Sequence, residues 1–252
     1  MEDYFIWNGV DSRTMGVVVT QLPPVVYPAE RVEQVTVPGR PGFLSRTEGV
    51  GIYDGYLKTV SIGNRRAADP RVIAAWLRGQ GEVIFGNEPD RVYFGRILKE
   101  ASLERSMRGV YAGAVSWMVQ PGKGQWPPEG AITITGRHYS LFNPGDLPAK
   151  PLYRVAKGTG ANIQLFLGPT TQYTHVTVTL ADTAWASETA VVIDSDAMQV
   201  TTADGSESLN SVTRLYYNGQ EGLWIPPHEA VDIDVVGDTQ SAVTVTPRWR
   251  WL

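Results

Sequence analysis

The sequence contains no cysteine in its 252 residues. Disulfide bonds, thiolate metal sites, iron–sulfur clusters and a cysteine nucleophile are therefore excluded. An excess of basic charge is missing as well, because 22 Lys and Arg residues stand against 26 Asp and Glu residues, for a net charge of −4. Proteins that bind nucleic acid usually carry a clear basic excess, so the overall charge does not indicate that function.

Long apolar runs are also absent from the sequence. No segment approaches the roughly 18 apolar residues that a membrane-spanning helix needs, so we expect no membrane insertion. The first residues, MEDYF, are acidic rather than basic and no apolar segment follows them, so we expect no signal peptide. Hydrophobic residues make up 42% of the chain and charged residues 19%, a composition that supports a packed core.

The chain does contain many short segments that are apolar or that alternate between apolar and polar residues. They lie at residues 17–19, 35–37, 83–85, 92–94, 176–180, 231–235 and 243–246. Alternation with a period of two places the apolar side chains on one face of a strand, as in half-buried antiparallel sheets. Because turn residues separate these segments, they predict a mainly β chain built of sandwiches or barrels.

One segment, DPRVIAAWLRGQG at residues 69–81, predicts a helix instead. Asp69 suits the N-cap, Pro70 suits the first helical position and Gly79 suits the end of the helix. A helix of roughly nine residues is too short to be stable alone, so we expect it to pack on a sheet. The residues at helical spacing on its apolar face are Val72, Ile73, Trp76 and Leu77.

Turn-rich segments divide the rest of the chain. GEVIF and RVYFGRI flank a turn at 86–90, which predicts a hairpin. PGKGQWPPEG at 121–130 holds three glycines and three prolines, a composition typical of an exposed connection between domains. FNPGDLPAKP at 142–151 then opens a second domain. We predict an N-terminal domain at 1–125, a connecting segment at 126–141 and a C-terminal domain at 142–252.

The loop VPGRPGF at residues 37–43 raises the question of phosphate binding. A phosphate loop needs successive free backbone N–H groups, usually with a helix N-terminus behind them. Here Pro38 and Pro41 lack that N–H group, and no helical pattern follows. A structural hairpin, or a loop that contacts another subunit, is therefore the favoured interpretation.

The sequence shows no clear motif for a metal site or for a catalytic nucleophile. The three histidines, His138, His175 and His228, have no metal-ligand spacing between them. Ser195 lies between two aspartates and outside a G-x-S-x-G motif, so nucleophilic catalysis has no support.

Two carboxylate pairs have the i, i+2 spacing that places both members on one face of a strand. They are Asp194 with Asp196 and Asp232 with Asp234. We interpret them as a solvated polar face rather than as the carboxylates of a glycosidase or a weak calcium site.

Eight tryptophans are many for this length, and exposed aromatic side chains bind sugars or partner proteins. In the terminal TPRWRWL, Trp249 and Trp251 alternate with Arg248 and Arg250, which predicts a strand with both indoles on one face. Packing in a core or a domain interface is favoured. A platform of stacked nucleic-acid bases between the arginines lacks wider basic support.

Five segments of the chain, taken in their order along the sequence, resemble those of a known family. They are YFIWNGVDSRTMGVVVTQLPP, ERVEQVTVPGRPGFL, WLRGQGEVIFGNEPDRVYFGRI, SLFNPGDLPAKPLYRVAKGTG and AVVIDSDAMQV. Together they resemble the distal tail protein (Dit) family of long-tailed, non-contractile bacteriophages over nearly the whole chain. The shared features include an Asn-Gly turn at 8–9, a V-P-G-R-x-G hairpin at 37–42 and an (I/L)-F-x-x-x-P-D-(R/K)-x-(Y/F) hairpin at 84–93. Pro41 stands where the family often has a polar residue.

The resemblance implies a fold and a role. The N-terminal domain is expected to be similar to tail-tube proteins, a β-sandwich or split barrel with one short helix, and the C-terminal domain to be a galectin-like or carbohydrate-binding-module-like β-sandwich. Six copies are expected to close into a ring at the tail tip of the virion, around a channel through which genomic DNA passes. The expected interface residues are Val37, Pro38, Gly39, Arg40, Pro41, Gly42 and Phe43.

The resemblance also implies partners. Besides other copies of the chain they are the tail-tube protein, the tail-associated hub protein and receptor-binding or tail-fibre proteins, and synthesis is expected in the host cytoplasm. No catalytic residue and no cofactor is implied. Two other functions stay open: a carbohydrate-binding module that contacts the host surface, and a glycoside-active tail enzyme that uses the acidic pairs.

Overall fold

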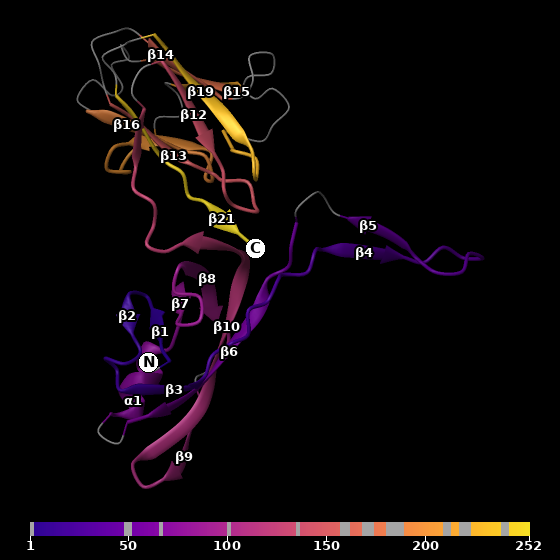
Figure 1. Cartoon of the computed structure of the whole chain (residues 1–252), viewed down its shortest axis with the longest axis vertical. Helices are drawn as coiled ribbons and strands as arrows, with labels where there is room; N and C mark the ends of the chain where they lie inside the picture. Colours follow the sequence, from indigo (N-terminus) through magenta and orange to yellow (C-terminus); the bar gives the residue numbers. More distant parts are fainter. Residues whose placement is uncertain are drawn as a thin grey trace. The chain divides into compact units, whose positions relative to one another are not determined.

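A computed structural model of the chain describes residues 3–47, 52–65, 68–99, 102–134, 137–156, 162–167, 174–179, 189–208, 213–216, 223–237 and 242–252. The chain divides into two compact units, residues 1–127 together with Leu252 and residues 128–251. Most regular structure in the described residues is β-strand, with one short helix, so the predicted fold class is confirmed (Figure 1). No helix in the described part of the chain has the length and apolar character needed to cross a membrane.

Unit 1, residues 1–127, is built on one antiparallel sheet with the strand order β2-β1-β7-β8-β10-β6-β3. β8 and β9 pair with successive stretches of the same edge of β10. The strands are β1 (Phe5–Trp7), β2 (Val10–Asp11), β3 (Val17–Gln21), β6 (Tyr56–Asn64), β7 (Gln80–Phe85), β8 (Arg91–Ile97), β9 (Ser102–Met107) and β10 (Val110–Gln125). Side chains of β1 and β3 share one core although these strands lie near opposite ends of the order, so the sheet curls around that core.

A two-residue turn joins β1 to β2. Trp7 pairs with Val10, and the residues between them, Asn8 and Gly9, have φ angles of 49° and 78°. Positive φ at both central residues defines the type I′ turn, which matches the twist of the strands and favours Asn-Gly. The Asn8 Oδ1 accepts a hydrogen bond from the Glu82 backbone N–H at 3.0 Å, which ties the turn to β7. The Asn-Gly turn expected from the sequence is confirmed.

The helix α1 (Pro70–Trp76) starts where the sequence predicts. The Asp69 carboxylate accepts a hydrogen bond from the Arg71 backbone N–H at 2.8 Å and so caps the first turn. Gly79 follows the helix with a φ of +84°, a left-handed conformation that suits glycine.

The helix packs on the sheet through a narrow stripe. Ile73 and Leu77 are buried, and the Trp76 ring stacks on Phe5 with ring centroids 5.6 Å apart. Val72, predicted to share this face, is instead 54% exposed. A helix of seven residues makes only two turns, so a single row of side chains reaches the sheet.

Aromatic side chains fill the core of unit 1. Trp117 of β10 is fully buried, and its ring centroid lies 5.3 to 5.9 Å from those of Phe5, Trp7 and Phe85. Tyr93 packs edge-on against Phe85 at 5.3 Å. Pairs in such edge and tilted arrangements add about 0.5–1.5 kcal/mol each beyond the area they bury.

The hairpin predicted around residues 86–90 is confirmed, because β7 and β8 pair antiparallel on either side of it. The prediction of an exposed connection at 121–130 is wrong for residues 121–125. β10 runs to Gln125 and pairs there with β8, and Lys123 is buried. The register shifts between Val119 and Lys123, so the Pro-Gly-rich sequence forms an irregular strand rather than a linker.

Unit 2, residues 128–251, contains two antiparallel sheets with the orders β11-β20-β13-β16-β17 and β12-β19-β14-β15-β18. The strands are β11 (Ile132–Ile134), β12 (His138–Phe142), β13 (Leu152–Ala156), β14 (Asn162–Leu167), β15 (Thr174–Thr179), β16 (Ala190–Asp194), β17 (Gln199–Thr202), β18 (Thr213–Tyr216), β19 (Ala230–Gly237), β20 (Val243–Thr246) and β21 (Arg250–Trp251). Tyr153 and Val191 from the first sheet pack with Leu141 and Ile233 from the second in one core, which makes the unit a β-sandwich. The predicted domain ranges stay a prediction; residues 126–141 hold β11 and the start of β12.

The C-terminal tryptophans pack inward. Trp249 belongs to the core of unit 2 and Trp251 packs against it, so the predicted core packing of both indoles is confirmed. The predicted continuous strand is wrong, because Arg248 has a φ of 55° and β21 begins only at Arg250. The Arg248 guanidinium turns instead to Asp194, whose Oδ1 it contacts at 2.9 Å.

The buried side chain of Asn143 holds two loops of unit 2 together. Its Nδ2 lies 3.0 to 3.1 Å from the carbonyl oxygens of Leu147, Ile225 and Pro226. Its Oδ1 accepts a hydrogen bond from the Gly145 backbone N–H at 2.9 Å. Both ends of the amide are therefore satisfied, as a buried amide requires.

We expect Asn143→Ala to lower the free energy of unfolding of unit 2 by about 1–3 kcal/mol, because it leaves buried carbonyl and N–H groups without partners. Urea unfolding of the full chain measures the effect. Ser140→Ala, at an exposed position of β12, is the matched control and should change stability by less than about 0.5 kcal/mol. Equal stability of the two variants would contradict the role of Asn143.

Candidate functional site

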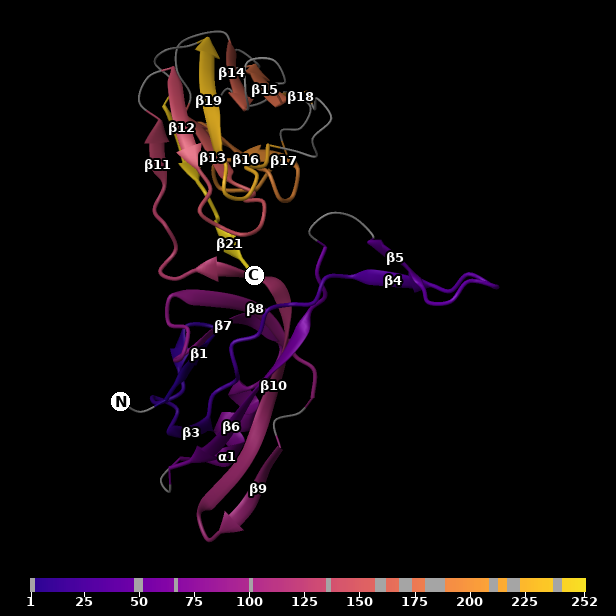
Figure 2. The same cartoon turned by 45° about the vertical axis from the view of Figure 1, so that its right-hand side comes forward.

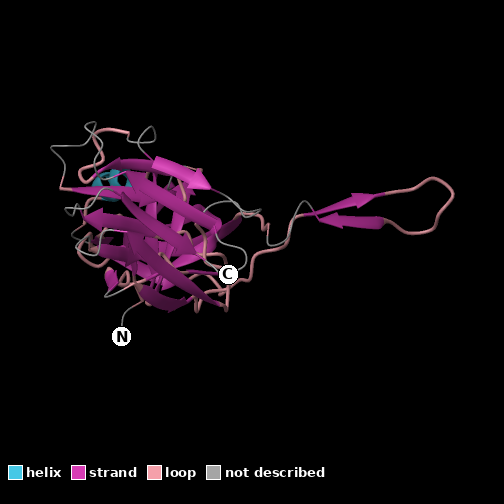
Figure 3. Cartoon of the chain, turned by 90° about the horizontal axis from the view of Figure 1, so that it is seen from above, coloured by secondary structure: helices cyan, strands magenta, loops and turns pink. Residues whose placement is uncertain are grey.

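A two-stranded arm leaves unit 1 between β3 and β6. β4 (Val32–Val35) pairs antiparallel with β5 (Leu44–Thr47), and the two strands form a sheet of their own. Figure 2 and Figure 3 show the arm extending away from the sheet of its unit. Every residue of β4 is exposed. An isolated two-stranded hairpin is marginally stable in water, so the arm is suited to contact with another molecule.

The tip of the arm is a tight turn. The Arg40 backbone N–H donates to the Val37 carbonyl oxygen at 3.2 Å, with Pro38 second and Gly39 third in the turn. Gly39 has a φ of +81°, which makes this a type II turn. Nothing lies within 4 Å of a Cβ built on Gly39, so glycine serves the backbone conformation there rather than space.

The predicted interface residues, Val37 to Phe43, all lie at this tip, and each from Pro38 to Phe43 is exposed. Their contact with another subunit stays a prediction. The phosphate interpretation is weakened, because the Arg40 N–H is already used in the turn and Pro38 and Pro41 have no N–H to offer.

The arm exposes apolar side chains to water. Val32, Val35, Leu44 and Phe43 are between 38% and 59% exposed. Val35 lies directly opposite Leu44, so these two form one apolar pair on the same face of the arm. Apolar side chains gathered on an unpaired hairpin indicate a surface that a partner covers.

Backbone contacts hold the root of the arm. Glu30 pairs with Tyr53, and the Arg31 backbone N–H donates to the Ile52 carbonyl oxygen at 2.9 Å. The Arg31 Nε also donates to Asp54 Oδ1 at 2.8 Å. Because exposed ion pairs contribute about 1 kcal/mol or less to stability, the backbone pairing is the main stabilising contact at the root of the arm.

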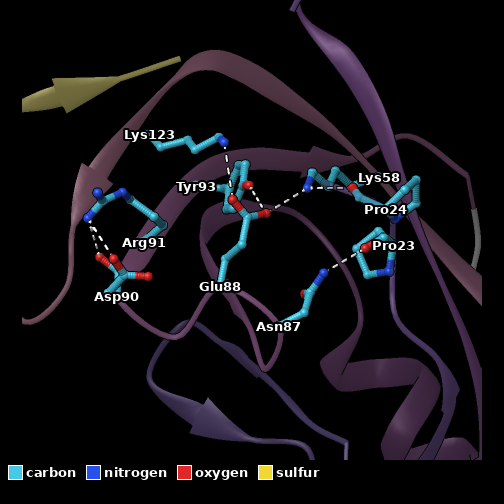
Figure 4. Close-up of polar contacts among 9 residues, drawn as sticks. All are labelled: Pro23, Pro24, Lys58, Asn87, Glu88, Asp90, Arg91, Tyr93 and Lys123. Carbon is cyan, nitrogen blue, oxygen red and sulfur yellow. Dashed lines mark hydrogen bonds and ion pairs between the residues drawn. The ribbon is translucent and has the colours of Figure 1, made fainter. Parts of the chain in front are cut away.

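A buried ionic cluster lies in unit 1 at the turn between β7 and β8 (Figure 4). The Glu88 carboxylate accepts hydrogen bonds from Lys58 Nζ at 3.0 Å and from Lys123 Nζ at 3.1 Å. The Tyr93 hydroxyl donates to the same carboxylate. The side chains of Lys58, Lys123 and Glu88 are 0%, 6% and 11% exposed. The three ionised groups come from β6, β10 and the turn, so the cluster joins three parts of the sheet.

Burial and charge act against each other in this cluster. Burial raises the pKa of Glu88, but the hydrogen bond from Tyr93 and the two lysines outweigh it and hold the pKa below its usual range. Burial lowers the pKa of Lys58, and its pairing with Glu88 opposes that shift. Burial and the Glu88 carboxylate raise the pKa of Tyr93. The same two causes raise the pKa of Tyr56 to about 12. An ionised Glu88 therefore sits between two cations and neutral tyrosines, an arrangement that holds structure together rather than one that donates protons.

The cluster also holds the segment that leads to the arm. Lys58 Nζ donates to the Pro24 carbonyl oxygen at 2.9 Å, and Asn87 Nδ2 donates to the Pro23 carbonyl oxygen at 2.8 Å (Figure 4). Sequence reasoning missed this site, because it treated residues 86–90 only as a turn. Glu88 meets its lysines 30 and 35 residues away in the chain, and no local pattern pairs residues at such separations.

In unit 2 the carboxylates of β19 flank a histidine. His138 lies opposite Asp234, with 2.6 Å between His138 Nδ1 and Asp234 Oδ1, and 3.8 Å between His138 Nε2 and Asp232 Oδ1. The hydrogen bond with Asp234 raises the pKa of His138. Among the described residues no group of three His, Cys, Asp or Glu side chains could hold a metal ion. Asp232 and Asp234 share one polar face of β19, as predicted, with His138 added to it.

His228 contacts a different carboxylate. His228 Nε2 is 3.2 Å from Asp146 Oδ1, in a loop of unit 2. The side chain of His175 lies outside the described residues.

The second carboxylate pair does not share a strand face. β16 ends at Asp194, and Asp196 lies in the turn that follows, so that prediction is wrong. Asp194 Oδ1 accepts the backbone N–H groups of Asp196 and Ala197 and contacts Arg248. Burial raises the pKa of Asp194, but Arg248 and these N–H groups outweigh it and lower the pKa. The general acid of a glycosidase needs a raised pKa, whereas that of Asp194 is lowered. Its hydrogen bonds suit it to stabilising the turn after β16.

We expect Glu88→Gln to destabilise unit 1 by about 3–5 kcal/mol, because it leaves two buried lysines without an anion. Urea unfolding measures the loss, and amide hydrogen exchange in β6, β8 and β10 locates it. Glu82→Gln, at an exposed position of β7, is the matched control. Because the folded-state pKa of Glu88 is lowered, its contribution is present above the unfolded value of about 4.3 and is lost as the pH falls below it. A variant as stable as wild type at neutral pH would contradict this role.

We expect NMR titration to give His138 a pKa above the ordinary value of about 6.5, and Asp234→Asn to lower that pKa. Any stability from the pair is present at low pH and is lost as the pH rises through the folded-state pKa, since the shift is upward. Ser140→Ala on the same face of β12 serves as the control. An unchanged titration in Asp234→Asn would disprove the assignment.

No protein-family model and no curated protein sequence matches the chain. Among solved structures, the chain is similar to the Dit (gp 19.1) protein of SPP1, described as a paradigm of the hub adsorption apparatus in phages that infect Gram-positive bacteria. The TM-score is 0.74 at 17% sequence identity, and the match covers 100% of both chains. The distal-tail-protein fold that the sequence resemblance implies is therefore confirmed over the full length of the chain.

Proposed function

We propose that the chain is a structural virion protein, a distal tail hub that joins the tail tube to the tail-tip and receptor-binding apparatus through a hexameric ring. The observation that carries the proposal is the full-length likeness in fold to SPP1 Dit, which is itself described as part of a hub adsorption apparatus. Because the match covers all of both chains, it extends beyond a single common β module.

The exposed arm supports ring formation. A contact between two different surfaces of the same chain is heterologous, and it closes into a ring when the rotation between neighbours divides a full turn. Pro38 and Pro41 restrict the tip before binding, so little conformational entropy is lost when a neighbour orders it. The tip residues Val37 to Phe43 are the proposed protomer contact.

The remaining partners follow from a place at the tail tip. They are the tail-tube protein, the tail-associated hub protein and receptor-binding or tail-fibre proteins, with synthesis in the host cytoplasm and genomic DNA passing through the ring. A net charge of −4 suits such a channel, because positive charge along it would retard DNA.

The proposed role is a scaffold without catalysis. In the described residues, Asp194 holds a turn and the Asp232–Asp234 face pairs with His138. The core packing of Trp249 and Trp251 also removes two indoles from the carbohydrate-binding alternative.

The oligomeric state of the purified chain tests the ring. Light scattering after size-exclusion chromatography should give a mass of six times 27.7 kDa, and negative-stain images should show rings. A chain that stays monomeric at every concentration would contradict the proposal.

Replacing both Pro38 and Pro41 by glycine should weaken assembly several-fold per contact, because each proline restricts the unbound tip by about 0.4–1 kcal/mol. The concentration at which rings form measures the change. Pro144→Gly, in an exposed loop of unit 2, is the control. Unchanged ring formation would contradict the proposal that the tip lies in the interface.

A further inference from the structure

The turn between β1 and β2 is built on Asn8 and Gly9, a dipeptide whose chemistry makes it prone to deamidation. The backbone nitrogen of a glycine that follows asparagine attacks the side-chain carbonyl carbon readily, because glycine has no Cβ to hinder the approach. The nitrogen loses its proton to a base, a C–N bond closes a five-membered imide ring, and the side-chain nitrogen leaves as ammonia. Water then opens the ring at either carbonyl and gives aspartate or isoaspartate.

The position of this turn gives the reaction access to water. Asn8 and Gly9 are both exposed. β2 is only two residues long and is the last strand at one end of the sheet order. Short elements at the edge of a sheet open locally at a lower free energy than the core does. Solvent therefore reaches the turn, and the geometry of the folded turn decides whether the reaction proceeds.

The folded turn holds the Asn8 carboxamide away from Gly9. Asn8 Oδ1 accepts the Glu82 backbone N–H at 3.0 Å, and the Asn8 backbone N–H donates to the Glu82 carbonyl oxygen at 2.9 Å. Glu82 belongs to β7, which lies on the side of β1 opposite to β2. The carboxamide thus reaches across to β7, whereas the backbone continues from Gly9 into β2.

Gly81 makes room for this contact. A Cβ built on Gly81 would lie 1.7 Å from Asn8 Oδ1 and 2.6 Å from Asn8 Cγ. A side chain at position 81 would therefore displace the carboxamide from the Glu82 N–H. Glycine inside a strand often marks such a close approach of another group, and here that group is the side chain of Asn8.

We propose that Asn8 is a deamidation site that the native turn keeps closed and that local opening of the turn exposes. For the imide ring to form, Asn8 Cγ must leave the Glu82 N–H and turn toward the Gly9 nitrogen. This movement disturbs the turn that Trp7 and Val10 close. The free energy of opening is therefore added to the barrier of the reaction, and folded chains react only through the fraction that is open.

The two products differ in what they allow afterwards. Aspartate at position 8 still offers an oxygen to the Glu82 N–H, so this product is able to resume the native turn. Isoaspartate adds one carbon to the backbone, and a two-residue turn with positive φ at both residues has no place for it. That turn ends the strand that brings Phe5 and Trp7 into the core. Isoaspartate at position 8 thus permanently marks chains that have opened at this edge.

Peptide mapping by mass spectrometry tests the protection without a substitution. The full chain is kept in mildly alkaline buffer with and without denaturing urea, and conversion at Asn8 is followed by the mass change that accompanies the exchange of ammonia for water. Without urea Asn8 should react at least about tenfold more slowly than in urea, because the hydrogen bond and the turn must open first. Equal rates under the two conditions would overturn the proposal.

The chain supplies its own chemical standard. Asn218 and Gly219 form the other Asn-Gly pair of the sequence. In urea the two pairs should react at similar rates, which attributes the slow reaction of Asn8 in buffer to the fold. An Asn8 that stays much slower than Asn218 in urea would show that its sequence neighbours protect it, and would overturn the proposal as well.

Gly81→Ala tests the contact that provides the protection. Its methyl group should displace the carboxamide and raise the Asn8 rate of the folded chain several-fold. Gly130→Ala, where nothing lies within 4 Å of a built Cβ, is the matched control and should leave that rate unchanged. Amide hydrogen exchange in β6 and β10 shows that the sheet is folded in both variants. An unchanged Asn8 rate in folded Gly81→Ala would overturn the role of the Glu82 contact. The urea comparison uses the unsubstituted chain, so it decides the protection even where Gly81→Ala does not fold.

Discussion

The buried carboxylate of Glu88 is the interaction on which the geometry of unit 1 depends. It brings Lys58 of β6 and Lys123 of β10 to one point, with the Tyr93 hydroxyl as a third donor. A buried ion cluster adds little net stability over an apolar core, but its bonds are directional and admit few alternatives. Since Lys58 also holds the Pro24 carbonyl, the cluster sets where the chain leaves the sheet toward the arm.

This anchoring explains how one unit combines a rigid body with an exposed hairpin. Sheet edges and unpaired ribbons are usually short, charged or covered, because they pair readily with other chains. The arm instead keeps apolar side chains in water, and the outer face of the sheet does the same at Leu57, Phe94 and Met118.

The likeness to SPP1 Dit at 17% identity shows how little of such a fold depends on particular residues. Alternating apolar positions and correctly placed turns define the strands, and many side chains of suitable volume can fill the core between them. What two such chains share is the order and pairing of strands. Their surface residues are free to differ.

The sequence by itself determined several of the strands, the helix cap at Asp69, the Asn8–Gly9 turn and the position of the arm tip, because short-range sterics and period-two alternation act within a few residues. It misread residues 121–125 as part of an exposed connection, since a glycine-rich irregular strand and a connection have the same composition. Only the tertiary structure decided that Glu88 would meet Lys58 and Lys123. Long-range pairing is set by strand register across the sheet, and no local pattern encodes it.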